Sequence, residues 1–339
     1  MAEGRPATIS QPVRALGAAL HDLTTERHEP DKPRRLRPDL WGTAGEIPAV
    51  YPALEEGSTV MSEYAIRWIS LDGNNWSAET KFPNHQTANE PALAVFDNTL
   101  YCVHRGGNDD ALWYSSFDGT RWSTDTTISN YRSAAGPALA VFNNQLYCVY
   151  RGANTDISLR YIVFDGKSWS AETKFPNHQT VAQPALAVFN NSLYCVHRGG
   201  NDDALWYSSF DGTRWSTDTT ISNYHSAAGP ALAVFSNQLY CVYRGANTDI
   251  SLRYIVFDGK SWSAETKFPN HQTVAQPALA VFNNSLYCVH RGGNDDALWY
   301  SSFDGTRWST DTTISNYHSA AGPALAVLKN QLYSVYRGE

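Results

Sequence analysis

The sequence predicts an all-β fold, a six-bladed β-propeller with four antiparallel strands in each blade, and three observations support this prediction. First, the marker PALAV-x-x-N-x-LY-x-V-x-RG recurs in steps of 46 or 47 residues, which is the spacing of propeller blades. Second, the residues between markers have strand and turn composition, and no window after residue 58 shows sustained helical periodicity. Third, the two ends of the repeat region hold complementary halves of one blade. The marker begins at Pro91, Pro137, Pro184, Pro230, Pro277 and Pro323.

The first three strands follow in order from the repeat that begins at Pro91. PALAVF predicts a short apolar strand, and LYCVHRG predicts a second strand rich in β-forming residues. Asp97-Asn98 between them predicts a tight turn, because Asn tolerates the positive φ that such hairpins need. GGNDDA is then a polar loop, and LWYSSF predicts the third strand.

The motif D-G-x-x-W closes each repeat and occurs six times. In this repeat Asp118-Gly119 predicts a hairpin turn, Trp122 begins a short fourth strand, and a loop around Asn130 and Tyr131 leads to the next marker. The motif resembles the Asp-box of sialidases and related propellers, which implies a structural turn remote from the active face. We expect Asp to cap the turn, Gly to take positive φ and Trp to pack between blades.

The two ends of the repeat region predict how the ring closes. Residues 64–73 match a third strand, whereas residues 337–339 come just after a second strand. Together they make one blade that both termini share, which leaves no open sheet edge. Because the six repeats alternate between two types, the ring is expected to be pseudo-threefold.

Two domains follow from this division. Residues 58–339 form the propeller, and residues 1–57 form an N-terminal tail that is mostly extended or disordered. Within the tail, residues 12–20 could begin a short helix, and residues 28–38 are Pro-rich and charged. A plug or clasp on the propeller is the alternative role for this segment.

The composition excludes several partners and bounds the localisation. The net charge is −7 and no basic stripe occurs, so we expect no nucleic acid partner. No apolar run approaches 18 residues and the N-terminus does not resemble a signal peptide, so we expect a soluble chain without membrane insertion. The five cysteines share one strand slot and should be buried free thiols, which fits synthesis in a reducing compartment, with or without later release.

The loops after the second and fourth strands lie on one face and carry most of the polar groups of the repeat. An Arg ends each second strand, and it follows a His in one blade type and a Tyr in the other. Across the loop stands a Trp in the first type and an Arg in the second. These residues are Arg105, Arg198 and Arg291 after His104, His197 and His290; Arg151, Arg244 and Arg337 after Tyr150, Tyr243 and Tyr336; Trp113, Trp206 and Trp299; and Arg160, Arg253 and Arg67.

Aromatic faces beside planar hydrogen-bond donors suit a sugar, which has an apolar C–H face and a ring of hydroxyls. Two structural alternatives stay open. The arginines could pair with loop acids such as Asp109 and Asp110 to tie blades together, and the tryptophans could fill space between blades.

Catalytic and metal sites have less support. Near-identical blades supply near-identical residues, whereas catalysis needs groups with different pKa values, so we do not expect an enzyme. The Asn-His-Gln-Thr loops, with His85, His178 and His271, would form a metal site only if they met at the ring axis, and we expect no metal and no cofactor.

The pattern PALAV…LY.V.RG…L.Y..FDG..W over residues 58–339 resembles the fucose-specific lectin superfamily of β-propellers. It is most similar to the bacterial Photorhabdus-type lectins and to insecticidal-toxin-like repeat proteins. The resemblance implies sugar binding in pockets between adjacent blades, without a cofactor, and a role in host-surface recognition or hemagglutination. The residues that match such a pocket best are Trp113 with Arg105 and Asn108, Trp206 with Arg198 and Asn201, and Trp299 with Arg291 and Asn294.

The leading prediction is therefore a multivalent carbohydrate-binding protein whose partners are cell-surface glycans, fucosylated ones among them. A protein-interaction propeller without a sugar site is the first alternative, and a sialidase-type glycosidase is the second. The oligomeric state is left open.

Overall fold

The computed structural model describes residues 64–339, which form strands β1 to β25 and contain no helix, hence none long and apolar enough to cross a membrane. The predicted tail, residues 1–57, and the predicted start of the propeller at residue 58 lie outside the described residues.

The strands fall into four groups by their place in a blade. First strands are β4 (Ala92–Phe96), β8 (Ala138–Phe142), β12 (Ala185–Phe189), β16 (Ala231–Phe235), β20 (Ala278–Phe282) and β24 (Ala324–Leu328). Second strands are β5 (Thr99–Arg105), β9 (Gln145–Arg151), β13 (Ser192–Arg198), β17 (Gln238–Arg244), β21 (Ser285–Arg291) and β25 (Gln331–Arg337). Third strands are β6 (Ala111–Phe117), β10 (Ser158–Phe164), β14 (Ala204–Phe210), β18 (Ser251–Phe257), β22 (Ala297–Phe303) and β1 (Ala65–Asp72). Fourth strands are β7 (Thr126–Arg132), β11 (Thr173–Gln179), β15 (Thr219–His225), β19 (Thr266–Gln272), β23 (Thr312–His318) and β3 (Thr80–Gln86), and β2 (Asn75–Trp76) adds a short pairing to β1.

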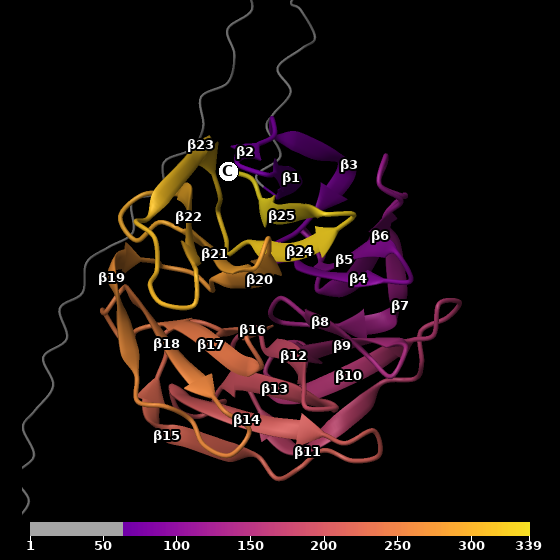
Figure 1. The fold of residues 1–339 in the computed structure, drawn as a ribbon. Coiled ribbons are helices and arrows are strands. Elements are labelled where there is room, and N and C mark those ends of the chain that lie inside the picture. Colours follow the sequence, from indigo (N-terminus) through magenta and orange to yellow (C-terminus); the bar gives the residue numbers. More distant parts are fainter. Residues whose placement is uncertain (1–63) are drawn as a thin grey trace, which may run out of the picture. The chain divides into compact units, whose positions relative to one another are not determined.

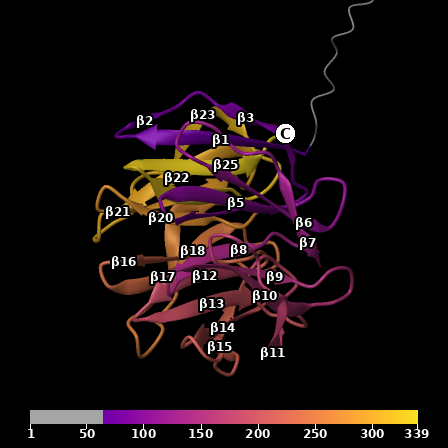
Figure 2. The ribbon, with the colours of Figure 1, turned by 90° about the vertical axis from the view of Figure 1, so that its right-hand side faces the viewer.

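Six antiparallel sheets follow one another around a ring, as Figure 1 shows, and the predicted propeller is confirmed. The first strands contact one another in ring order, and β24 meets β4 to complete the circle. The shared blade is also confirmed, because β1 pairs with β25 from Ile66 opposite Arg337 to Leu71 opposite Leu332. These two strands lie side by side in both views (Figures 1 and 2).

The blades are of two kinds that alternate. We call β4–β7, β12–β15 and β20–β23 the His blades, because His104, His197 and His290 precede the Arg that ends the second strand. We call β8–β11, β16–β19 and the sheet of β24, β25, β1 and β3 the Tyr blades, after Tyr150, Tyr243 and Tyr336.

The predicted turns form as expected. Asp97 and Asn98 have φ of 48° and 56°, and Gly119 in the D-G turn has φ of 102°. Trp122, which follows that turn, packs at a tilt against Phe82 of the preceding blade with 4.2 Å between ring centroids, so this Trp does pack between blades. All five cysteines are buried free thiols, and burial raises the pKa of each of them.

The fourth strand corrects the prediction. Trp122 forms only an isolated bridge to Phe117, and β7 begins at Thr126 and includes Asn130 and Tyr131, which we expected in a loop. Only Ile128 of this strand is buried, and the register shifts between Ala111 and Trp113, so no regular apolar alternation marks it. In the same way, the Asn-His-Gln segments belong to β3, β11 and β19 rather than to loops.

The D-G turns predict a pH dependence of stability. Asp211 Oδ1 accepts hydrogen bonds from the backbone N–H groups of Thr213 at 2.7 Å and Arg214 at 2.9 Å. Bonds from Thr213 and these amides lower the pKa of Asp211 to about 2, and the pKa values of Asp118, Asp165, Asp258 and Asp304 are lowered as well. Because the folded pKa is depressed, this stabilisation is present above the unfolded pKa of about 4 and is lost as the pH falls toward about 2.

We therefore expect the melting temperature to fall over this acid range, measured by circular dichroism. Replacing the five turn Asp residues with Asn, which keeps an acceptor but does not titrate, should flatten part of that decline. An identical acid profile in the substituted protein would contradict this assignment.

Candidate functional site

Three equivalent pockets lie where the fourth strand of a Tyr blade meets the next His blade, and we call these places the open junctions. The pockets have volumes of about 570, 550 and 380 Å³ at the junctions of β3, β11 and β19 with the blades that follow. Each is lined by a Pro-Asn-x-Gln segment, a Gly-Gly-Asn-Asp loop, a Trp and a Thr-Asp pair. The pseudo-threefold ring thus repeats one pocket three times.

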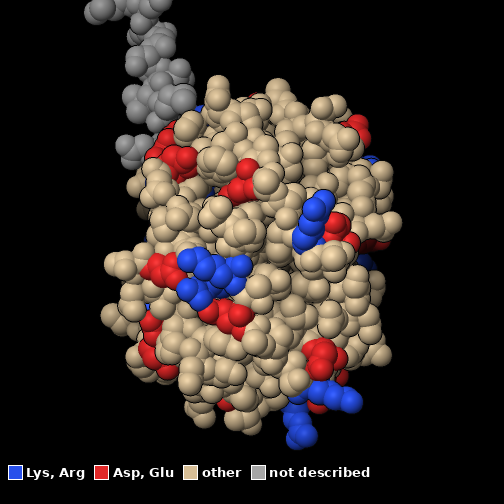
Figure 3. Space-filling view, turned by 60° about the vertical axis from the view of Figure 1, so that its left-hand side comes forward, with Lys and Arg blue, Asp and Glu red and all other residues tan. Residues whose placement is uncertain are grey.

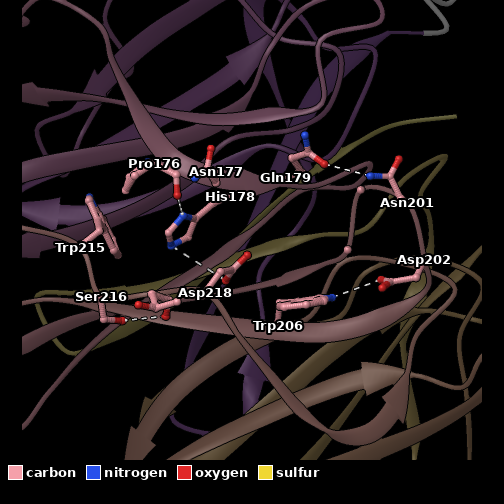
Figure 4. A pocket seen from close by; sticks show the side chains of 13 residues that line it. Pro176, Asn177, His178, Gln179, Asn201, Asp202, Trp206, Trp215, Ser216 and Asp218 are labelled. Atoms are coloured by element: carbon pink, nitrogen blue, oxygen red, sulfur yellow. Dashed lines mark hydrogen bonds and ion pairs between the residues drawn. The ribbon is translucent and has the colours of Figure 1, made fainter.

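The wall of the middle pocket comes from two blades, as Figure 4 shows. Gln179 at the end of β11 accepts a hydrogen bond from Asn201 Nδ2 at 3.0 Å, which joins the rim across the junction. Gly199 and Gly200 let the loop approach closely, because a Cβ on Gly200 would lie 2.7 Å from Gln179 Cβ. Equivalent rim bonds join Asn108 to Gln86 and Asn294 to Gln272.

Trp206 on β14 presents a half-buried indole to this pocket. Its Nε1–H donates to Asp202 Oδ1 at 3.2 Å, and the same oxygen accepts from the backbone N–H of Ala204 at 3.2 Å. The hydrogen bond from Nε1 at the edge of the indole therefore fixes the Trp to the loop and satisfies its one polar group. Trp113 with Asp109 and Trp299 with Asp295 repeat the arrangement.

Asp218 lies between two buried histidines at the floor. His197 Nε2 is 3.0 Å from its Oδ1, and His178 Nε2 is 4.0 Å away without a hydrogen bond to the described residues. The side chain of Asp218 is 15% exposed, so the carboxylate keeps some access to the pocket. Asp125 and Asp311 occupy the same place in the other two pockets, and burial lowers the pKa of the neighbouring His85.

The other three junctions, where a His blade precedes a Tyr blade, have a different set of residues, and we call them closed. Arg160 takes the place of Trp, Glu172 that of Asp218 and Tyr150 that of His197. The Arg160 guanidinium bridges Glu172 and Asp156, the latter at 2.6 Å, and the buried Tyr150 hydroxyl donates to Glu172. Burial and this bond raise the pKa of Tyr150.

A tyrosine from the preceding blade completes each closed junction. The Tyr131 hydroxyl donates to Ser170 O at 3.2 Å and accepts from Glu172 N–H at 3.1 Å, whereas the open junctions have a His at this position of the fourth strand. Tyr224 and Tyr317 repeat both contacts. The polar groups of these junctions therefore bond one another.

The structure brings together only part of the predicted site. Trp113, Asn108 and their counterparts line the pockets, but Arg105, Arg198 and Arg291 do not. Their Nε atoms donate to the carbonyls of Ser133, Ser226 and Ser319 at 2.9, 2.7 and 2.6 Å, which ties each second strand to the loop after the fourth. Arg151 and Arg244 hold their own loops through the carbonyls of Asn154 and Asn247.

The predicted aromatic neighbours of these arginines are buried. His104, His197 and His290 lie beneath the pockets and contact Asp125, Asp218 and Asp311, so their connection to a ligand is through that carboxylate. Tyr150 and Tyr243 are fully buried in core clusters that each join two neighbouring blades. His85, His178 and His271 lie at three separate junctions, and residues 64–339 contain no cluster of side chains that could hold a metal.

Sequence reasoning missed the Thr-Asp segments at residues 124–125, 217–218 and 310–311, which line the pockets. They follow the D-G turns that we took to be remote from function. One signal was available, because the two blade types exchange Trp for Arg, Asp for Glu and His for Tyr together.

No Lys or Arg lines any of the three open-junction pockets of residues 64–339, whereas two Asp residues line each of them. On the face shown in Figure 3, Lys and Arg lie beside Asp and Glu and form no continuous basic patch.

The fold is similar to that of several solved structures, lectins among them. AofleA from Arthrobotrys oligospora aligns with a TM-score of 0.57 at 11% identity, over 74% of this chain and 79% of that one. Aleuria aurantia lectin, solved as a point mutant in complex with Fucα1-6GlcNAc, aligns with a TM-score of 0.55 at 15% identity, over 74% and 89%. A protein of unknown function from Dyadobacter fermentans aligns with a TM-score of 0.55 at 10% identity, over 74% and 94%.

No family model and no curated protein matches the sequence. The structural similarity to solved fucose-binding lectins confirms the predicted resemblance for the fold alone. The similarity to Photorhabdus-type lectins stays a prediction.

Proposed function

We propose that this chain is a carbohydrate-binding protein that engages cell-surface glycans through its three open-junction pockets. The observation that carries the proposal is the pocket itself, in which a half-buried Trp held by its edge stands near a partly exposed carboxylate. An indole face can stack on the C–H face of a sugar, and carboxylate oxygens accept hydrogen bonds from its hydroxyls.

The alternation of junctions supports three sites rather than six. At two closed junctions, Arg160 and Arg253 each bridge two carboxylates, and at the third Arg67 pairs with Glu79. An Arg thus takes the position that an aromatic face holds at the open junctions. Three weak sites on one rigid ring can raise avidity for a multivalent surface by about 10²–10⁴ over a single site. Repetition would thus serve binding, whereas a single asymmetric catalytic centre would gain nothing from it.

Fucosylated glycans are the first candidates, because Aleuria aurantia lectin was solved with Fucα1-6GlcNAc. A glycan array followed by calorimetry with the simplest sugar that binds tests the proposal, and we expect three sites per chain. Agglutination of cells that carry the recognised glycan is the second measurement.

Three outcomes would count against this reading. No binding to any glycan would overturn the lectin proposal, and a protein partner whose capture survives competing free sugar would favour the scaffold function. Six equivalent sites by calorimetry would overturn the restriction to open junctions.

A further inference from the structure

The charged side chains that line the three open-junction pockets are all acidic, although the protein surface carries both acidic and basic residues. Asp202 and Asp218 line the middle pocket, and Asp109 with Asp125 and Asp295 with Asp311 line the other two. No Lys or Arg among the described residues lines any of them. A ligand in these pockets therefore meets two carboxylates on a lining that includes no ammonium or guanidinium group.

Among the described residues, neither carboxylate forms an ion pair with a Lys or Arg. Among residues 64–339, Asp202 Oδ1 accepts hydrogen bonds only from neutral N–H groups, those of Trp206 and of the backbone of Ala204. Asp218 contacts His197, and the buried Nε2 of His178, which makes no hydrogen bond to the described residues, lies 4.0 Å from it. The floor thus retains hydrogen-bonding capacity that the described residues do not use.

The Trp indole in each pocket adds to the preference for a positively charged ligand that the two carboxylates create. The face of an indole attracts cations within about 6 Å of the ring and disfavours anions, because its quadrupole places negative charge on the face. Trp206 stands between the two carboxylates in Figure 4, and its edge is turned to Asp202. A sugar that stacks on this face and carries an ammonium group could donate up to three hydrogen bonds to the carboxylates.

We propose that the open-junction pockets select sugars by charge: they bind a sugar with a protonated amine more tightly than its N-acetylated counterpart and reject its carboxylated counterpart. This inference rests on the proposed carbohydrate-binding function and names the ligand class within it. An uncharged sugar ranks between the two extremes.

The test compares matched sugars by calorimetry at low salt, at a pH where the amines are protonated. The probes are glucosamine, N-acetylglucosamine, glucose and glucuronic acid, and the same four forms in the galactose series. We expect the amine to bind about ten-fold more tightly than the N-acetylated form, the size of one charge-assisted hydrogen bond. Added salt should reduce this ratio, because screening weakens charge interactions at an exposed site.

The carboxylates are tested in a variant that carries Asp109→Asn, Asp202→Asn and Asp295→Asn together. The ratio of amine to N-acetyl affinity should fall toward one, and the corresponding change at Asp125, Asp218 and Asp311 gives a second, independent variant. Asp97→Asn is the matched control, since it removes a negative charge at a hairpin turn where other blades already have Asn, and its ratio should stay as in the parent.

The outcomes separate the two proposals. If glycans bind but the acidic sugars compete as well as the amines, or if neither series binds, selection by charge is overturned while sugar binding stands. If no glycan binds at all, the proposed function itself fails.

Discussion

Removing residues 323–339 is expected to abolish the folded propeller. This truncation deletes β24 and β25, so β1 loses the six backbone positions that pair Ile66 to Leu71 with Arg337 to Leu332. Two of the six core clusters combine residues from both ends of the described chain, and both would open. Since Ile66, Ile69 and Leu71 are almost fully buried, the cut exposes apolar surface on the strands that remain.

The expected loss is comparable to the whole stability of a typical domain. Burial of one large apolar side chain contributes about 1.5–3 kcal/mol, and the deleted segment carries six that are buried. They are Leu325, Leu328, Leu332, Tyr333, Val335 and Tyr336. The sum, roughly 10 kcal/mol or more, compares with a net stability of about 5–15 kcal/mol for native proteins.

Circular dichroism and thermal melting of the truncated chain measure this effect. A synthetic peptide of residues 323–339 added in trans should restore the melting transition if the two strands complete the shared blade. Leu332→Ala is the milder variant, expected to cost about 2–5 kcal/mol because Leu332 is fully buried opposite Leu71. A truncated chain with an unchanged melting temperature would contradict the closure.

The architecture was predictable because apolar strand segments mark both the repeat period and the two halves of the shared blade. Strands such as PALAVF have short apolar runs, and burial of these runs is what holds neighbouring blades together. The fourth strand lacked such a signal, since Thr126–Arg132 buries only Ile128 and contains a register shift between Thr127 and Arg132. Its position depends on backbone pairing with β6, which polar residues satisfy as well as apolar ones.

The site was predictable only in part because each pocket joins two blades. Trp206 and Asn201 could be recognised from their residue types, but Gln179 reaches Asn201 across a junction between sheets. The direction of Arg198 could not be read from the sequence, because the carbonyl of Ser226 determines it and any residue supplies a carbonyl. Trp, Asp and His of the His blades are replaced together by Arg, Glu and Tyr in the Tyr blades. The structure explains this joint replacement, because the Arg and the Tyr both bond the Glu.

Replacing Trp113, Trp206 and Trp299 with Ala is expected to abolish glycan binding while the propeller stays folded. Loss of a central aromatic anchor costs about 2 kcal/mol or more, roughly a 30-fold loss of affinity at each site. When all three sites weaken, the avidity from multivalent attachment is lost as well. The fold should tolerate the change, because the Tyr blades have an Arg such as Arg160 at this position and form the same strand pairing.

The single and double variants make this prediction specific to three sites. One Trp→Ala change should leave a divalent protein that still agglutinates, two should leave one binding site without agglutination, and three should remove both. Trp→Phe variants keep an aromatic face but lose the Nε1 bond to Asp109, Asp202 or Asp295, so they should fall between parent and Ala. Agglutination titres and array signals measure the series, with thermal melting as the folding control.

Because the three pockets repeat one geometry, the loss should depend on how many tryptophans are removed and hardly on which ones. A single substitution that removes all binding would instead indicate one dominant site, and a triple variant that binds like the parent would place the ligand elsewhere on the ring.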